Sequence, residues 1–434
     1  MRCERFTLDG DPAQTAAALR DLIPAPESVR EMVAEIIAEV RSHGDTALLD
    51  YIARFDTAGA QPKPIRVRPD ELEAAASTLD ARVRHGLERA IENLETVMVG
   101  WRAGLGQSVQ LGENQVVLRH AAVSRAAVYV PGGRAPYPST VVMGVVPARL
   151  AGVEHIAVCA PPSRDGDVDP VVLAACHMTG AAVAYRMGGA HAISALAYGT
   201  ASVAPVDMIV GPGSLYVQEA KRQVFGQVGI DGFAGPSDLL AVATGDADPD
   251  TLALDLLAQA EHGPGTLVIA VSDALELLSK LVRRLEDAPD TGALSAVVEA
   301  SDAGQALALA EAFAPEHLQL VGARAEALAD RVTRAGCVFV GPGAGTAFGD
   351  YIAGSNHILP TNGAARFASG LSPEHFLRRF TEVRIADGGE LARSAAPLAR
   401  AEGFELHAES MEARIDGEWS TAPGGGAFGD NGPR

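Results

Sequence analysis

Cysteine, aromatic residues and positive charge are all scarce in this chain of 434 residues, and each scarcity excludes a class of protein. The 4 cysteines show no CxxC pair and no disulfide-like spacing, which excludes a disulfide scaffold and indicates a reducing compartment. Lys and Arg number 35 against 55 Asp and Glu, so the net charge of −20 argues against nucleic-acid or anionic-membrane partners. Acidic proteins are common, however, and solubility alone accounts for such a charge.

Long hydrophobic runs are also missing. Gly, Pro or a charged residue interrupts each apolar stretch before it reaches the length of a transmembrane helix. The N-terminus, MRCERFTLDG, lacks the apolar core of a secretory signal. With 47% hydrophobic and 21% charged residues, the chain can bury more than one core. We therefore expect a soluble, cytoplasmic protein.

The sequence does contain a repeated unit, in which a short apolar run is followed by a glycine turn and a helix-like segment. In the first series the apolar runs lie at 126–133, 155–162, 182–189 and 206–213. A second series begins near Asp238 and continues to CVFVGPG at 337–343. Near-continuous Val, Ile and Ala strands that alternate with helices predict parallel sheets covered on both faces. The predicted fold class is α/β, with two Rossmann-like lobes, largely parallel sheets, and small helical extensions at both termini.

The changes in pattern along the chain also predict its domains. The predicted parts are an N-terminal extension (1–25), a first α/β lobe with the chemistry (26–123 and 233–371), a second, Rossmann-like lobe (124–232), a small C-terminal unit (372–416) and a disordered tail (417–434). The tail is predicted from its Gly and Pro content and its lack of periodicity.

Two polar clusters interrupt apolar surroundings and are candidates for chemistry. In LLAQAEHG, Gln259 and His262 lie three residues apart at the end of a helix, so both could reach one ligand or metal. In APEHL, the adjacent Glu316 and His317 precede an apolar strand, where each could accept a proton. Each cluster also has a structural interpretation, the first as a capping His beside an exposed Gln and the second as a surface pair.

A third cluster lies in FGDYIAGSNHILPT (348–361), which we expect to be a loop of small residues. It contains Asp350, Asn356 and His357. Long loops inside a compact domain tend to be functional. Asp350 could be an oxygen ligand for a metal or the cap of the following turn. A fourth segment, EGFELH (402–407), adds a carboxylate and a histidine near the C-terminus.

Together these clusters resemble the histidinol dehydrogenase family, in the same order and over the chain from about residue 10 to residue 415. The matching segments are YVPGG, GGAHAISALAYGT, GPGSLYVQEAKR, IDGFAGPSD, LLAQAEHG, APEHL, GDYIAGSNHILPT and EGFELHAESMEARI. The resemblance implies an enzyme that uses zinc, one ion per subunit, and NAD to oxidise L-histidinol through the aldehyde to L-histidine. It also implies a homodimer whose subunits exchange their C-terminal units.

The resemblance further implies roles for individual residues. The implied zinc ligands are Gln259, His262, Asp350 and, from the partner subunit, His407. The implied base for the alcohol step is His317, and Glu316 would activate water for oxidation of the aldehyde. The implied substrate contacts are Ser237, His357 and Glu402, together with His317 and the zinc ligands. The implied cofactor contacts are Tyr129, His191 and Ser214.

Two of these positions depart from the family pattern. His191 stands where we expect Gln, and Ser214 stands where we expect Asn. Either replacement can hydrogen-bond a nucleotide, although the reach of both side chains changes. Both positions belong to the cofactor side, so the zinc and acid–base positions are unaffected.

Two other functions remain open from the sequence. A related dehydrogenase of the same fold would oxidise another small alcohol, such as a sulfonated propanediol, but Glu402 favours a substrate that carries an imidazole. A non-catalytic, two-lobed protein would hold a metabolite between its lobes. Such a protein would have no need for Glu316 or His317, and both are present.

Overall fold

The computed structural model describes residues 1–23, 28–102, 107–132, 135–233 and 235–415. The tail expected at 417–434 lies outside these residues. The chain divides into a large unit, Met1–Arg102 with Ala122–Leu377, and a small unit, Ala103–Ala121 with Arg378–Arg434. The predicted α/β class is confirmed, because the large unit contains two sheets in which the strands pair in parallel.

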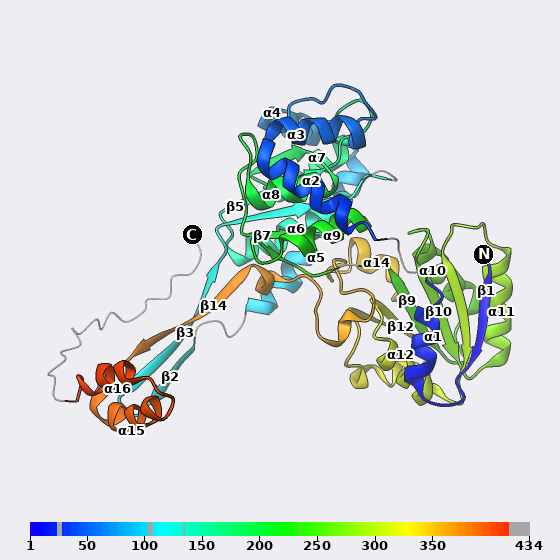
Figure 1. Ribbon diagram of the computed structural model, residues 1–434. Helices are drawn as coiled ribbons and strands as arrows, with labels where there is room; N and C mark the ends of the chain where they lie inside the picture. The colour runs from blue at the N-terminus through cyan, green and yellow to red at the C-terminus, as the bar shows by residue number, and fades with distance from the viewer. Residues whose placement is uncertain (24–27, 103–106, 133–134, 234, 416–434) are drawn as a thin grey trace. The chain divides into compact units, whose positions relative to one another are not determined.

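One sheet of the large unit has five strands in the order β6-β5-β4-β7-β8, of which Figure 1 labels β5 and β7. The strands are β4 Arg125–Tyr129, β5 His155–Ala160, β6 Val183–Arg186, β7 Met208–Val210 and β8 Gly229–Ile230. Numbered along the chain, the strands have the 3-2-1-4-5 order of a Rossmann sheet. All of them are parallel, and the order in which they are added changes side between β4 and β7. Successive side chains of β4 point to opposite faces, so Val128 enters one core while Ala127 and Tyr129 enter the other.

Helices cover both faces of the five-stranded sheet, which explains why its strands read as continuous apolar runs. One face carries α4 Pro69–Ser77, α5 Ala81–Val99, α6 Pro138–Ala151 and α7 Pro170–Thr179, and the other carries α2 Arg30–His43, α3 Asp45–Tyr51, α8 Gly189–Tyr198 and α9 Leu215–Val224. This packing differs from the expected division, which grouped 26–123 with 233–371. The periodicity of a helix reveals its apolar face but not the sheet which that face covers.

The other sheet has six strands in the order β1-β11-β10-β9-β12-β13. The strands are β1 Cys3–Thr7, β9 Asp238–Ala243, β10 Leu267–Ser272, β11 Leu294–Glu299, β12 His317–Val321 and β13 Cys337–Val340. Strands β9 to β13 repeat the 3-2-1-4-5 order, and β1 pairs with β11 at the edge. One face carries α10 Pro249–Ala260 and α11 Leu275–Asp287, and the other carries α1 Pro12–Arg20 and α12 Ala303–Phe313. The segment 1–25, expected as an extension, thus supplies an edge strand and a covering helix.

Shorter helical turns connect these elements. They are η1 Ile52–Asp56, η2 Gly100–Arg102, α13 Ala323–Glu326, η3 Ala329–Arg331, α14 Thr346–Tyr351, η4 Ala364–Arg366 and η5 Pro373–Phe376. No helix in the described part of the chain has both the length and the low polarity that a bilayer crossing demands. The four cysteines are free thiols, and Cys3, Cys159 and Cys176 are buried.

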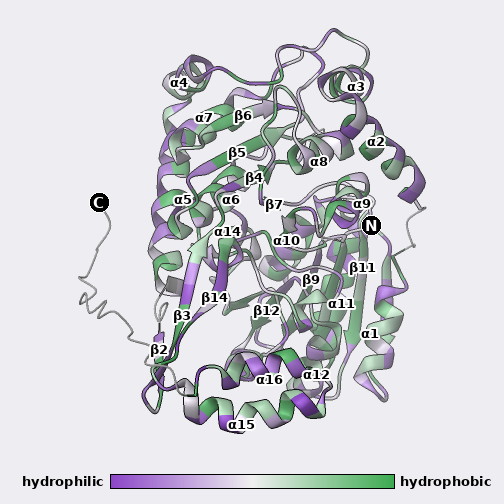
Figure 2. Ribbon diagram, turned by 60° about the vertical axis from the view of Figure 1, so that its left-hand side comes forward, coloured by the Kyte–Doolittle hydropathy of each residue, from purple (hydrophilic) through white to green (hydrophobic). Residues whose placement is uncertain are grey.

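The small unit consists of a three-stranded sheet and two helices. Its strands, in the order β14-β3-β2, are β14 Leu377–Arg384, β3 Asn114–Ala122 and β2 Gln107–Leu111, and its helices are α15 Gly388–Ala401 and α16 Glu405–Glu412. Gly403, with φ +82°, separates the two helices. Hydrophobic and hydrophilic residues alternate along α15 and α16 (Figure 2). Several hydrophobic side chains here are exposed, among them Leu398 at 63% and Leu406 at 78%.

Candidate active site

The expected catalytic pair lies at the amino edge of the six-stranded sheet. Asp238 begins β9 and His317 begins β12, and these strands are parallel neighbours in which His317 pairs with Leu239. Ser237 and Glu316 each precede their strand by one residue. Open α/β sheets usually bind ligands at the carboxyl ends of their strands, so this group lies at the opposite edge from the usual one.

Hydrogen bonds join this group. Oε2 of Glu316 accepts from the Ser237 hydroxyl at 2.5 Å and from the Asp238 N–H at 3.1 Å. Oδ1 of Asp238 accepts from the Glu316 N–H at 2.7 Å, and Nδ1 of His317 lies 3.3 Å from the Asp238 carbonyl oxygen. Gln259, near the end of α10, donates from Nε2 to Ser237 Oγ at 2.6 Å. Glu316 and His317 are buried, so they are not a surface pair.

The charges of this group shift one another's protonation. Burial, and next to it the charge of Glu316, raises the pKa of Asp238 to about 7. Burial also raises the pKa of Glu316. Burial works against a protonated ring on His317, but the charge of Glu316 and the contact with Asp350 raise the pKa of His317 to about 9. The site thus holds an imidazole and a carboxylate in different environments, and His317 can accept a proton only in its deprotonated form, whose share grows as the pH approaches 9.

Asp350 approaches the pair from α14. The expected loop therefore contains a short helix, whose six residues are too few for a hydrophobic period to be visible in the sequence. Oδ1 of Asp350 lies 3.8 Å from Nε2 of His317. Burial works against the charged carboxylate, but the hydrogen bond with His317 lowers the pKa of Asp350. A positive charge on His357 or on His262 would act on Asp350 in the same direction.

His357 follows α14 and both of its ring nitrogens have partners. Nδ1 lies 2.9 Å from the carbonyl oxygen of Asp350, and Nε2 lies 3.2 Å from the hydroxyl of Thr140 on α6. A carbonyl only accepts hydrogen bonds, so Nδ1 carries the proton, and Nε2 of the neutral ring accepts from Thr140. Burial lowers the pKa of His357, which favours this neutral form.

The expected zinc ligands are divided between the two units. Gln259 and His262 stand at the end of α10, as predicted, with Gln259 buried and His262 exposed. In the described ranges no three or more His, Cys, Asp or Glu residues are grouped so that they could hold a metal ion. Of the expected zinc ligands in the large unit, only His262 and Asp350 are residues of these types. The expected set therefore also needs the Gln259 amide and one further ligand. Nitrogen and oxygen donors of this kind suit zinc.

The remaining expected ligand and one substrate contact belong to the small unit. Glu402 caps the end of α15, and His407 lies in α16 with its ring 5.1 Å from that of Phe404. Both side chains are exposed. These residues are therefore available to a group that comes from outside the small unit.

Two of the expected cofactor contacts lie at the carboxyl edge of the five-stranded sheet, where such sheets usually bind ligands. Tyr129 ends β4, and its hydroxyl accepts from the Gly189 N–H at 3.1 Å. Ser214 is exposed and immediately precedes α9, after the turn Gly211–Gly213 that follows β7. Backbone N–H groups at such a helix start can receive a phosphate.

His191, the third expected cofactor contact, is placed differently. It is only 1% exposed, its Nε2 lies 3.1 Å from Oδ2 of Asp56, and its ring stacks on Tyr51 at 5.8 Å. The same oxygen of Asp56 accepts from the Gly188 N–H at 3.1 Å. In this arrangement His191 holds Asp56 beneath the loop that starts α8, and its ring does not face solvent.

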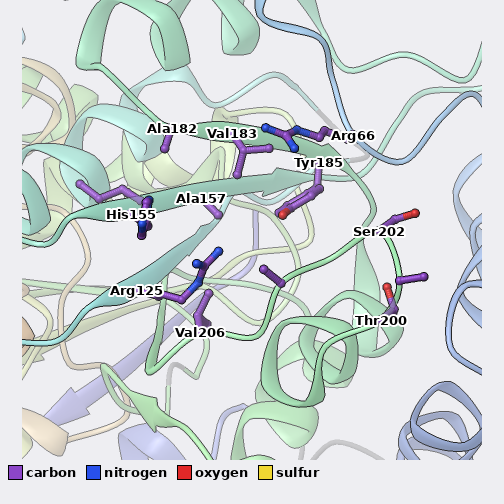
Figure 3. Close-up of a pocket in the computed structure, with 13 residues that line it drawn as sticks. Arg66, Arg125, His155, Ala157, Ala182, Val183, Tyr185, Thr200, Ser202 and Val206 are labelled. Atoms are coloured by element: carbon purple, nitrogen blue, oxygen red, sulfur yellow. The ribbon is translucent and has the colours of Figure 1, made fainter.

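A pocket of about 470 Å³ opens at the amino edge of the five-stranded sheet and includes none of the expected site residues. Figure 3 shows Arg66, Arg125 and His155 among the side chains that line it. Arg125 is the first residue of β4, and Tyr129 is the last. The pocket and the expected cofactor side therefore lie at opposite ends of the same strand.

The structure adds three residues to the site that the sequence did not single out: Asp238, Arg20 and Asp56. Nη1 of Arg20 lies 3.8 Å from Oδ2 of Asp238, and its guanidinium carbon lies 3.9 Å above the ring of Phe313. Asp238 had a visible signal, since a charged residue opens an otherwise apolar strand. Arg20 and Asp56 come from segments far away in the sequence, and no local pattern marks them.

Comparisons with known proteins identify the family of this chain. The sequence model of the family described as histidinol dehydrogenase matches residues 24–415. The histidinol dehydrogenase of Parasynechococcus marenigrum (strain WH8102) is 41% identical over 428 residues, which cover 96% of this chain and 98% of that protein. The one from Rhodospirillum rubrum is 42% identical and covers 96% of this chain and 99% of its own length. The crystal structure of histidinol dehydrogenase from Elizabethkingia anophelis matches with a TM-score of 0.88 at 29% identity, over 95% of this chain and 98% of that one. The chain therefore belongs to the histidinol dehydrogenase family of oxidoreductases.

Proposed function

We propose that this protein oxidises L-histidinol through L-histidinal to L-histidine with NAD, as an enzyme of histidine biosynthesis. The observation that carries the proposal is the buried pair Glu316 and His317, which contacts Ser237 and Asp350 in a chain of this family. A histidine and a carboxylate side by side suit two oxidations at one site, because the first removes an alcohol proton and the second requires an activated water.

In the first step His317 would accept the hydroxyl proton of histidinol, and bound NAD would supply the acceptor for the hydride of the carbinol carbon. The carbonyl oxygen of Asp238 fixes Nδ1 of the His317 ring, so Nε2, on the side of Asp350, is the atom that receives the proton. In the second step Glu316 would remove a proton from the water that adds to the aldehyde, and a second NAD would supply the acceptor for the hydride. Among the described residues, Ser237 and Asp238 donate to the same oxygen of Glu316, Oε2, which leaves Oε1 for the water.

The donor set fits a zinc ion with one external ligand. Gln259, His262 and Asp350 would hold it from one subunit and His407 of the partner subunit would complete it. The metal would orient the substrate's amine and imidazole as a template. Ser237, His357 and Glu402 would hold the rest of the substrate. Tyr129 and Ser214 would contact NAD. His191 would act on the cofactor side indirectly, through its contact with Asp56.

We place the protein in the cytoplasm as a homodimer whose small units are exchanged. The free thiols agree with a reducing compartment. In the small unit Leu398, Phe404 and Leu406 are each more than half exposed. Exposed hydrophobic side chains of this kind are typical of a surface that a partner covers in an assembly. Glu402 and His407 lie among these residues, so covering this surface would also deliver both side chains to a neighbouring site.

The test combines metal analysis with an NADH assay on the purified protein. We expect zinc to copurify, L-histidinol to give about two NADH per L-histidine, and a chelator to abolish turnover. Replacing His317 by Asn should lower turnover by about a hundredfold or more while zinc and substrate binding persist. Turnover of dihydroxypropanesulfonate in place of histidinol would overturn the substrate, and full activity of the Asn variant would overturn the role of His317.

A further inference from the structure

Asn356, the residue before His357, is buried and occupies a gap in the hydrogen bonding of α6. Pro147 lies inside this helix and has no N–H to donate to the carbonyl four residues earlier, which is that of Met143. Nδ2 of Asn356 donates to this carbonyl oxygen at 2.7 Å. Oδ1 of Asn356 accepts from the Ile358 N–H at 2.8 Å. The amide therefore binds α6 with one end and its own chain segment, across His357, with the other.

Helix α6 also holds His357 directly, through the hydroxyl of Thr140 at 3.2 Å from Nε2. Thr140 and Met143 are three residues apart, so the two contacts leave the same side of the helix. Ile358 packs into the same hydrophobic core as the helix, which fixes the segment on the far side of His357. His357 thus stands between two anchored residues and has little freedom to turn.

We propose that Asn356 is a positioning residue, which fixes the backbone on either side of His357, and with it the ring that Asp350 and Thr140 hold, by binding the carbonyl that Pro147 leaves free on α6. This inference rests on the proposed function, in which His357 contacts histidinol. Helix α6 follows β4, whose last residue is the expected cofactor contact Tyr129. The amide therefore holds a substrate contact on the same lobe as the cofactor side, which keeps substrate and NAD in register for hydride transfer.

The test is Asn356→Ala, compared with the wild type in KM, kcat and thermal unfolding. We expect the KM for L-histidinol to rise about tenfold, the effect of losing one well-placed interaction, while the KM for NAD stays within about twofold. The matched control is Gln223→Glu, because Nε2 of Gln223 also donates to a backbone carbonyl, that of Arg30 at 2.9 Å, in the same lobe. This control should leave the KM for histidinol unchanged.

A second variant separates positioning from stability. In Asn356→Ala combined with Pro147→Ala, the new N–H at 147 can donate to the Met143 carbonyl within the helix. We expect part of the lost Tm to return while the KM for histidinol stays high. Recovery of both quantities together, or parallel rises in the KM values for histidinol and NAD, would show a structural role alone and overturn the proposal.

A third readout does not depend on activity. In protein labelled with ¹⁵N at histidine, the His357 signals, assigned by their loss in His357→Gln, should report an Nδ1–H ring in the wild type and change in Asn356→Ala. Unchanged His357 signals would overturn the positioning role even if the wild type oxidised another substrate. A wild type with no histidinol turnover but with the expected change in these signals would contradict the proposed function and leave the anchoring of His357 in place.

Discussion

At the scale of single residues, Asp238 connects the parts of the proposed catalytic group. Its backbone and side chain both bond Glu316, its carbonyl oxygen lies against the His317 ring, and its carboxyl group faces Arg20. A carboxyl group that is buried between another carboxylate and a single arginine 3.8 Å away loses solvation without full compensation. Its protonation is therefore coupled to the stability of the fold.

Replacing Asp238 by Asn should change how stability depends on pH. The native pKa of Asp238 is raised to about 7, above its ordinary value, mainly by burial. Between about pH 4 and pH 7 the native state therefore binds more protons than the unfolded state, and this residue makes the free energy of unfolding fall as pH rises. Asn imitates the protonated form, so the variant should gain on the order of 4 kcal/mol relative to the wild type across this window, about 1.4 kcal/mol for each pH unit. Urea unfolding at several pH values measures this, and two parallel curves would contradict it.

The sequence predicted much of this group but not its connections. Glu316, His317 and Gln259 were singled out because polar residues stood in apolar surroundings. The bonds that Asp238 makes depend on β9 and β12 being neighbours, and they pair across about 80 residues of chain that include β10 and β11. For His191 the sequence predicted a cofactor contact but not the burial of the ring against Asp56. That burial depends on packing between α8 and η1, which no local motif describes.

At the scale of elements, the N-terminal segment is part of the core of the six-stranded sheet. Strand β1 completes one edge, and α1 covers a face together with α12. Leu19 of α1 is fully buried in this core, and the next residue, Arg20, reaches Asp238. An element outside the part of the chain matched by the family model thus supports the catalytic group.

Shortening Leu19 to Ala should destabilise the protein by about 2–5 kcal/mol, because a buried leucine leaves a cavity. Leu254 on α10 is 67% exposed, so Leu254→Ala is the matched control and should change stability by about 0.5 kcal/mol or less. Chemical denaturation of both variants gives the comparison. Equal effects would mean that α1 does not belong to the cooperative core.

The sequence predicted most of these elements and their type, because apolar runs and glycine turns alternate through 126–343. It did not predict which elements pack together. Helix α2 and strand β1 both carry an apolar face that several partners could cover, and only the complete set of neighbours selects one. The short helix α14 was missed since it has less than two turns.

At the scale of the whole molecule, the small unit has a hydrophobic surface that a single chain leaves exposed. Leu391, Leu398 and Leu406 expose hydrophobic side chains on two short helices, beside Glu402 and His407. A unit of this size buries little apolar surface by itself. An exchanged arrangement in the proposed homodimer would account for both the hydrophobic surface and the missing fourth ligand.

Mixing two inactive variants should therefore restore activity. In a heterodimer of His317→Ala and His407→Ala subunits, one site carries both changes and the other carries neither. Random exchange yields about half heterodimers, so about one quarter of the wild-type activity should return. The matched control pairs His317→Ala with Glu316→Gln, whose changes both lie in the large unit and leave no intact site. No recovery in the first mixture, after exchange is proven by mass spectrometry, would contradict a ligand from the partner subunit.

The two sheets of the large unit share one strand order but use opposite edges, and this has a practical consequence. The proposed chemistry of the six-stranded sheet lies where its strands begin, so we expect the turns at their far ends to lie away from the reaction. Among these turns, residues 245–246 and 301–302 are exposed. A fluorophore or an inserted peptide tag at these points can follow folding and assembly while the enzyme continues to turn over.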